Sequence, residues 1–385
     1  MAQVAHRATV INPGLREDGP WVTEDLWFRV FVLMALVSGF FAHAWIIAVA
    51  KKAYKYGVGA AISAKEAAAP KVEQAKDQMV ARIPGRIVVD RNMGAGADFP
   101  DLPTAIARAN DGDVIAVKDG IYDQTIEVNK TITIGGMGTN PDAVWITSPG
   151  PRTILLTKGR LTFRNITLSN AADQEGLVAE VSGGALILRT VNLKSPGKGI
   201  RVQDGELDAS DSTFDSVNTL VLDGKAEAKI LRGAIVASQT AIEAKGSSAV
   251  LKLERTTIQS SDGSAIEASR FAKVRIDDST LRRNARAAVV VSSGADAKVQ
   301  RTSIAENRGC GMMINGGSVD LEQVSFDSSQ CGIGFGGPGT ADVRKSVFSN
   351  LAVGPVALKK GIGKQVVLRG GDNVGLEIPK VKSDK

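Results

Sequence analysis

The chain carries an internal repeat of about 22 residues, and a period of this length constrains the fold more than any single motif. Each repeat contains two apolar residues separated by one residue, and successive pairs begin 20 to 24 residues apart. Many pairs are followed by a segment in which apolar and polar residues alternate, such as LTFRNITLSN and LKLERTTIQS. A period of two residues predicts β-strands rather than helices. The pairs begin at Ile154, Leu177, Ile200, Leu220, Ile242, Ile266, Val289, Met312, Ile333, Val353 and Leu376.

Units of two or three short strands cannot bury an apolar face alone, so each unit must stack on the next. The sequence therefore predicts an all-β, right-handed parallel β-helix, a solenoid in which equivalent residues lie about 4.8 Å apart. We expect Ile200, Ile242, Ile266 and Ile333 to lie one above another. Short polar residues close many repeats and are expected to form a hydrogen-bonded column: Asn170, Ser195, Ser216, Ser238, Ser260, Asn284, Asn307, Ser328 and Asn350.

Cys310 and Cys331 occupy equivalent places in consecutive repeats, in CGMMI and CGIGF. The spacing of neighbouring strands falls within the Cα separations found in disulfides. The pair can therefore be bridged or can form a reduced buried stack, and we favour the reduced stack.

The residue between the two apolar residues of each pair is expected to point outward. Two of these outward residues, Glu243 and Glu267, are one repeat apart and suit an acid/base pair or a cation site. Lys245 and Arg270 lie nearby, so a charge-balanced surface is the favoured interpretation. Several of the others are apolar, which predicts a face covered by a partner, unless the register is shifted by one residue in some repeats. The candidate partner face is Leu155, Val178, Val221, Val290 and Met313.

Residues 30–50, VFVLMALVSGFFAHAWIIAVA, are long and apolar enough for one transmembrane helix. A cleaved signal peptide is the alternative, because AVA at 48–50 resembles a cleavage site. His43 lies inside this span and is the one candidate for cofactor binding, since FFAHAW resembles the pigment-binding helices of light-harvesting antennae. The favoured interpretation is a neutral histidine bonded to a backbone carbonyl or a partner helix.

The predicted organisation follows from these segments and from the charge distribution. Residues 87–379 contain 33 basic and 33 acidic side chains, so a nucleic-acid partner is excluded for the large domain. The predicted segments are a tail (1–29), a transmembrane helix in contact with lipid (30–50), a basic Ala-rich helical linker (51–86), the β-helix (87–378) and a C-terminal tail (379–385).

Residues 98–136, DFPDLPTAIARANDGDVIAVKDGIYDQTIEVNKTITIGG, resemble the N-terminal end of the pectin-lyase-like superfamily, especially its pectin methylesterase-like members. The resemblance extends over roughly 87–378 and implies a helix near 103–109 that caps the β-helix. It indicates the fold but not the function, because the superfamily contains lyases, esterases, hydrolases, epimerases, tailspikes and non-catalytic binders.

The catalytic motifs that the resemblance would imply are missing from the β-helix sequence. The two histidines, His6 and His43, precede it, and Trp145 has no arginine two places before it. A lyase-like calcium and arginine site remains compatible with the composition, but repeats this short leave little chain for the loops that wall such a cleft. We therefore assign no catalytic residue, no metal and no cofactor.

These observations favour a single-pass membrane protein that presents a non-catalytic β-helix as a scaffold or binding protein, such as a subunit of an envelope assembly. The alternative is a membrane-tethered, lyase-like enzyme for acidic polysaccharides. Lys51, Lys52 and Lys55 beside the span favour a cytoplasmic β-helix. The related β-helix proteins are mostly exported, and we place the domain on the extracytoplasmic side.

Overall fold

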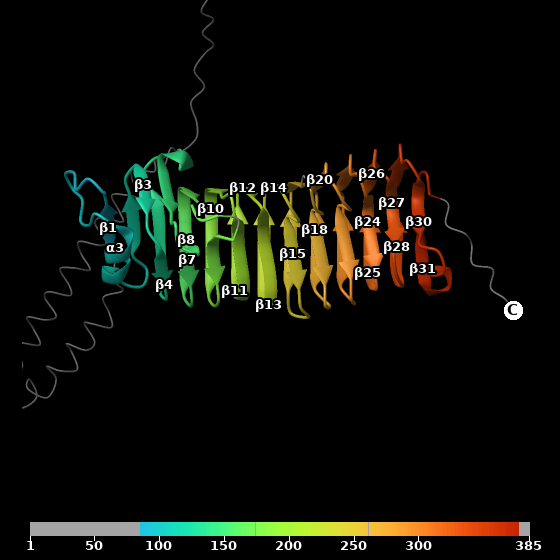
Figure 1. Ribbon diagram of the computed structural model, residues 1–385, viewed down its shortest axis with the longest axis horizontal. Coiled ribbons are helices and arrows are strands. Elements are labelled where there is room, and N and C mark those ends of the chain that lie inside the picture. Colours follow the sequence, from blue (N-terminus) through green and yellow to red (C-terminus); the bar gives the residue numbers. More distant parts are fainter. Residues whose placement is uncertain (1–84, 174, 261, 377–385) are drawn as a thin grey trace, which may run out of the picture. The chain divides into compact units, whose positions relative to one another are not determined.

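The computed structural model describes residues 85–173, 175–260 and 262–376. They coil into a right-handed parallel β-helix of about 11 turns, here called rungs, which confirms the predicted all-β solenoid (Figure 1). Within these residues no helix has the length and apolarity needed to cross a membrane. The predicted spanning helix, 30–50, and its His43 lie outside the described residues.

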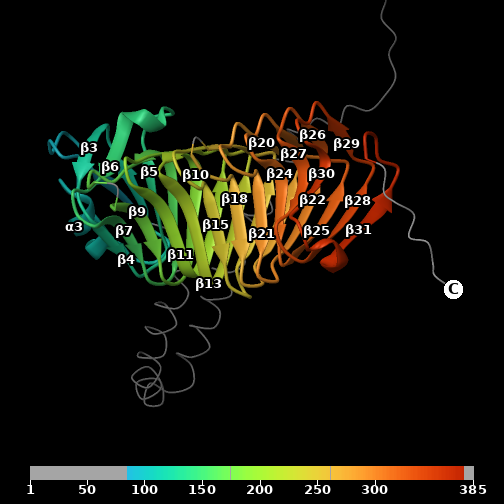
Figure 2. The same cartoon turned by 45° about the vertical axis from the view of Figure 1, so that its right-hand side comes forward.

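Three parallel sheets run along the axis of the β-helix, and each rung contributes to them in turn (Figure 2). Sheet 1 contains β4 (Ile126–Val128), β7 (Arg152–Leu156), β9 (Leu177–Val181), the first parts of β11 (Lys198–Ser210) and β13 (Asn218–Leu231), β15 (Ile242–Lys245), β18 (Ile266–Ser269), β21 (Val289–Ser292), β24 (Cys310–Asn315), β27 (Cys331–Phe335) and β30 (Gly354–Leu358).

Sheet 2 contains β1 (Arg86–Val89), β2 (Val114–Val117), β5 (Ile132–Gly136), the first parts of β8 (Arg160–Leu168) and β10 (Ala185–Lys194), the second parts of β11 and β13, β16 (Val250–Glu254), β19 (Lys273–Asp277), β22 (Asp296–Gln300), β25 (Gly317–Glu322), β28 (Gly339–Arg344) and β31 (Val366–Gly371). Sheet 3 contains β3 (Gly120–Asp123), β6 (Val144–Thr147), the ends of β8 and β10, β12 (Thr213–Ser216), β14 (Ala234–Ala237), β17 (Thr257–Ser260), β20 (Thr280–Arg282), β23 (Ser303–Ala305), β26 (Ser325–Asp327) and β29 (Val347–Ser349).

The apolar pairs of the repeat form continuous inward columns in sheet 1, as predicted. Ile242 pairs with Ile266, and the same column continues through every rung from Ile154 to Val356. Ile200 and Ile333 belong to it, and all four isoleucines named in the prediction are at most 1% exposed. Alternation of inward and outward side chains along each strand is what aligns them.

The predicted register is wrong in two rungs. Ala179, not Leu177, pairs with Ile154, and Val356, not Val353, pairs with Ile333. The strand LVAEV begins with three apolar residues, so either Leu177 or Ala179 could start the inward pair in sequence. The structure pairs Ala179 with Ile154 and with Ile200, which continues the inward column.

A short helix closes the N-terminal end of the core, near the predicted position. α3 (Leu102–Arg108) buries Leu102, Ala105 and Ile106 against the first rungs. Asp101 caps it by accepting a hydrogen bond from the backbone N–H of Thr104 at 2.8 Å. The helix therefore shields apolar residues that no earlier rung covers.

A buried polar ladder joins the later rungs at the turn between sheet 3 and sheet 1. Oδ1 of Asn307 accepts from Nδ2 of Asn284, and the backbone N–H of Asn307 donates to Oγ of Ser329. The sequence predicted Ser328 as the ladder residue after Asn307, and this prediction is wrong. Ser328 has a φ of +47° in the turn, and Ser329 is the buried residue.

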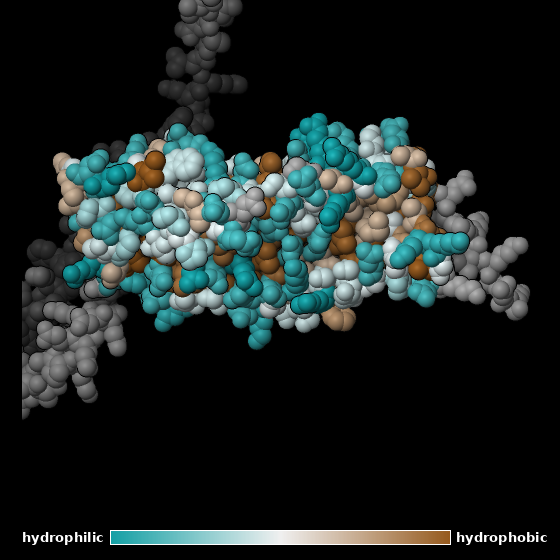
Figure 3. All heavy atoms as spheres, viewed as in Figure 1, coloured by the Kyte–Doolittle hydropathy of each residue, from teal (hydrophilic) through white to brown (hydrophobic). Residues whose placement is uncertain are grey.

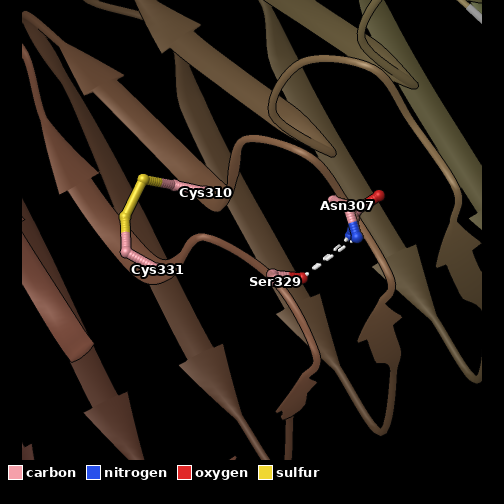
Figure 4. The surroundings of a disulfide bond; sticks show 4 residues. All are labelled: Asn307, Cys310, Ser329 and Cys331. Atoms are coloured by element: carbon pink, nitrogen blue, oxygen red, sulfur yellow. Dashed lines mark hydrogen bonds between the residues drawn. A yellow bond between two sulfur atoms is a disulfide. The ribbon is translucent and has the colours of Figure 1, made fainter. Parts of the chain in front are cut away.

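Cys310 and Cys331 form a disulfide, so the favoured reduced stack is wrong. Their Cα atoms are 4.3 Å apart because the two residues are direct partners of β24 and β27. Figure 4 shows that the bond joins the same two rungs as the Asn307–Ser329 hydrogen bond. The covalent and polar links therefore reinforce one corner of the β-helix.

Candidate functional site

In each strand of sheet 1, one residue points outward between the two inward residues. The pairing of neighbouring strands aligns these outward residues into one column along the axis, here called the outer column. The outer column is Leu155, Glu180, Arg201, Val221, Glu243, Glu267, Val290, Met313, Gly334 and Ala357.

Four residues of the predicted partner face, Leu155, Val221, Val290 and Met313, lie in the outer column. The placement of Val178 in it is wrong. Val178 is 0% exposed, and Glu180 occupies the corresponding outward position. The shifted register of LVAEV explains this difference.

The outer column carries glutamates in its middle rungs, and each accepts a hydrogen bond from a residue that lies two positions before the first inward residue of the preceding rung. Nδ2 of Asn218 donates to Oε1 of Glu243 at 2.9 Å, and Lys245 forms an ion pair with the same carboxylate. Oγ1 of Thr240 donates to Oε1 of Glu267 at 3.1 Å. Each glutamate therefore has one hydrogen-bond donor in the preceding rung, and Glu243 has a second in its own strand.

Glu243 and Glu267 are direct partners in adjacent strands, as the predicted acidic pair requires. Each of the two carboxylates is engaged by polar side chains of the same surface, Glu243 by Asn218 and Lys245 and Glu267 by Thr240. Such engagement fits the charge-balanced surface better than an acid/base pair. Among the described residues, no three histidine, cysteine, aspartate or glutamate side chains are arranged to hold a metal ion.

The outer column becomes apolar at Val290. Ser264 stands where Asn218 and Thr240 stand in earlier rungs, two residues before the first inward residue of its strand. Its Oγ is buried and has no hydrogen-bond partner among the described residues. The outward residue of the next rung is Val290, which offers no acceptor.

Met313 lies against the space that Gly334 leaves open. A Cβ at Gly334 would stand 2.9 Å from both Sγ of Cys310 and Cε of Met313, so only glycine fits beneath them. A shallow pocket of about 330 Å³ lies here, and its lining includes Val353 and Leu358. These two side chains are 64% and 54% exposed.

We call Val290, Met313, Gly334, Val353, Ala357 and Leu358 the apolar patch. In the view of Figure 3, hydrophobic surface appears in separate spots along the rod, and some of it lies over the C-terminal rungs. Side chains of this kind in contact with water cost free energy that a covering partner would recover. The patch is therefore a candidate docking surface for an apolar partner.

A second polar cluster, on the outer face of sheet 3, was not predicted. The carboxylate of Asp142 accepts hydrogen bonds from Asn192, Thr167 and Lys194 at 2.7 to 3.0 Å. These bonds, that from Asn192 foremost, lower the pKa of Asp142 to about 2. Nζ of Lys194 also lies 5.4 Å from the ring centroid of Trp145. The cluster fixes a charged carboxylate and anchors the loop around Asp142 to the sheet.

No motif in the sequence signals this cluster. Asp142 is 50 residues from Asn192 and 25 from Thr167, and only the stacking of rungs brings them together. Its donors saturate the carboxylate, so the cluster is better suited to fixing the loop than to proton transfer.

Comparison with known proteins supports the fold. Residues 218–368 match the family described as "Right handed beta helix region". A search of curated proteins by sequence found no significant match.

Several solved structures are similar. The A-module of the mannuronan C-5 epimerase AlgE6 from Azotobacter vinelandii has a TM-score of 0.51 and 12% identity, over 72% of this chain and 94% of that chain. The catalytic unit of a GH87 alpha-1,3-glucanase from Streptomyces thermodiastaticus has a TM-score of 0.49 and 13% identity, over 71% of this chain and 65% of that chain. The present chain therefore spans less than two thirds of that glucanase. Pectate lyase Pel9A has a TM-score of 0.48 and 14% identity, over 75% of this chain and 80% of that chain. At 12% identity the similarity to the epimerase module shows the fold alone, in agreement with the matched right-handed β-helix region.

Proposed function

We propose that this chain is a membrane-anchored, non-catalytic β-helix that binds a protein partner through the apolar patch, as a subunit of an envelope or membrane assembly. The observation that carries the proposal is the change in the outer column at Val290. From there to the last rung, the residues of the outer column are Val290, Met313, Gly334 and Ala357, which are apolar or glycine. Val353 and Leu358 extend the same surface in an exposed state.

Two further features support binding rather than chemistry on this face. The glutamates of the outer column are engaged by donors from their own surface, and the rungs beyond them present Met313 and Gly334 in place of polar groups. A regular rod with a smooth apolar end suits the alignment of partners along its axis. The similar proteins include enzymes that act on glycans, so a polysaccharide-processing activity is the alternative that the experiment must separate.

The test uses the full chain in its native membrane, extracted in mild detergent. The size of the extracted particle is compared for the wild type, Met313→Glu and a control, Thr257→Glu, which places the same charge outward on sheet 3. We expect the wild type and the control to migrate as a complex, and Met313→Glu to migrate as the chain alone with an unchanged circular dichroism spectrum.

Equal particle sizes for all three proteins would contradict the proposed partner site. The same preparations are then incubated with a panel of acidic polysaccharides and calcium. A rise in ultraviolet absorbance from unsaturated products, absent from a mock preparation, would establish the lyase-like alternative instead.

A further inference from the structure

The two cysteines of the Cys310–Cys331 bond are largely buried and border the shallow pocket beside Met313. Cys310 is 5% exposed and Cys331 is 0% exposed, and Met313 lies next to Sγ of Cys310 over Gly334. The bond therefore lies within the packed rungs at one corner of the rod, next to a pocket that opens to the surface.

The fold itself brings the two sulfur atoms together. The cysteines are 21 residues apart, and they become neighbours only when β27 stacks on β24 in the observed register. They are also the only two cysteines in the 385-residue sequence. The bond therefore uses the full thiol content of the chain and has no competing pairing.

Packing alone does not require cysteine at this corner. The equivalent residues of earlier rungs are Asn218, Thr240, Ser264 and Ala287, which shows that the position accepts several small or polar side chains. Two cysteines in consecutive rungs differ from these residues in one respect: when oxidised, they link the rungs covalently.

Closing the bond converts two thiols into one disulfide and releases two electrons and two protons. The electrons must pass to an oxidant, such as the disulfide of a thiol oxidase or a quinone coupled to one. Cytosolic thiol pools keep such pairs reduced, whereas exported compartments supply the oxidant.

We infer that the β-helix is a substrate of a thiol-oxidising reaction and matures in an oxidising compartment, on the extracytoplasmic side of the membrane. The inference does not rest on the proposed partner. The excess of lysines at Lys51, Lys52 and Lys55 would by itself predict a cytoplasmic β-helix. Long domains cross membranes despite such charges, so the lysines do not contradict the inference.

The first test measures thiol oxidation in intact cells that express the full chain. Cells are quenched in acid, and free thiols are tagged under denaturing conditions with a maleimide that adds a visible mass shift. We expect no shift for the wild type before reduction, a shift of two tags after reduction, and one tag without reduction for Cys310→Ser. Two tags on the wild type before reduction would overturn the inference.

The second test determines on which side of the membrane the β-helix lies, and it does not depend on the disulfide. Ser247→Cys, an exposed site in a Cys310→Ala/Cys331→Ala background, is treated in intact spheroplasts with a membrane-impermeant maleimide. We expect labelling equal to that after lysis. Labelling that appears only after lysis would place the β-helix in the cytoplasm and overturn the inference, whether or not the partner experiment succeeds.

Discussion

Asn284 donates its side-chain amide to Oδ1 of Asn307 one rung later, with a distance of 2.7 Å between Nδ2 and Oδ1. The same oxygen accepts the backbone N–H of Asn284 at 3.1 Å. Both residues are buried, so one amide oxygen satisfies two donors that water does not reach. The ladder therefore holds the turn between sheet 3 and sheet 1 through hydrogen bonds that are shielded from water.

Asn307→Ala is expected to lower the free energy of unfolding by roughly 2 to 3 kcal/mol, because it leaves two buried donors of Asn284 unsatisfied. Denaturant titration followed by circular dichroism measures the change. The control, Asn129→Ala, alters an exposed asparagine and should change stability by less than about 0.5 kcal/mol. Equal midpoints for the two variants would show that the ladder does not stabilise the turn.

Two glycines make room for an aromatic stack beneath the disulfide corner. The rings of Phe326 and Phe348 stack with centroids 4.7 Å apart. A Cβ at Gly332 would stand 2.5 Å from the Phe348 ring, and one at Gly311 would stand 2.5 Å from the Phe326 ring. We expect Gly332→Ala to destabilise the β-helix by about 1 to 3 kcal/mol through overpacking.

Thermal unfolding measures this effect, and Gly363→Ala is the control because no atom lies within 4 Å of its added Cβ. The double variant Gly332→Ala/Phe348→Leu should recover part of the loss, since the smaller side chain relieves the contact. A Gly332→Ala protein as stable as Gly363→Ala would mean that the ring moves aside without cost.

The inward columns were predictable from sequence because a period of two residues identifies the buried face wherever polar residues interrupt the apolar ones. Ile266 and Glu267 are an example of such an unambiguous alternation. The prediction failed where the interruption is missing. Leu177, Val178 and Ala179 are all apolar, and only the stacking on Ile154 settles which of them faces inward.

The candidate site was predictable to the same extent. The repeat spacing of 23 residues from Ile266 to Val289 and on to Met312 places Val290 and Met313 outward although both lie in apolar runs. The exposed edge formed by Leu358 depends on how the last rung ends, which no local pattern records. The Asp142 cluster depends on residues brought together by rung stacking, and the oxidation state of Cys310 depends on chemistry beyond the pattern.

Protonation of Asp142 should weaken the fold only in strong acid. The folded-state pKa of about 2 lies below the ordinary 3.8, with the hydrogen bond from Asn192 as the largest cause. The ionised carboxylate therefore stabilises the fold above about pH 4, and this contribution is lost as the pH falls through about 2. Its side chain is 42% exposed, so solvent screening limits the contribution to less than about 1 kcal/mol.

Carbon-13 NMR of the Asp142 carboxyl checks the assignment by giving its titration midpoint directly. Asn192→Ala should raise that midpoint toward 3.8 because the largest cause of the shift is removed. The titration of Asp142 in the wild-type protein provides the reference. A midpoint unchanged by Asn192→Ala would assign the shift to Thr167 and Lys194 instead.

Removal of the disulfide should destabilise the C-terminal rungs. The bond closes a loop with a sequence separation of 21 residues, and loops of this length contribute about 3 kcal/mol by restricting the unfolded chain. We expect Cys310→Ala/Cys331→Ala to lose about that amount relative to the oxidised wild type in denaturant titrations. Hydrogen exchange should accelerate most in β24 and β27, which the bond joins directly. A reductant should move the wild type toward the variant and leave the variant unchanged, whereas identical midpoints for the oxidised wild type and the variant would show that rung stacking alone holds this end together.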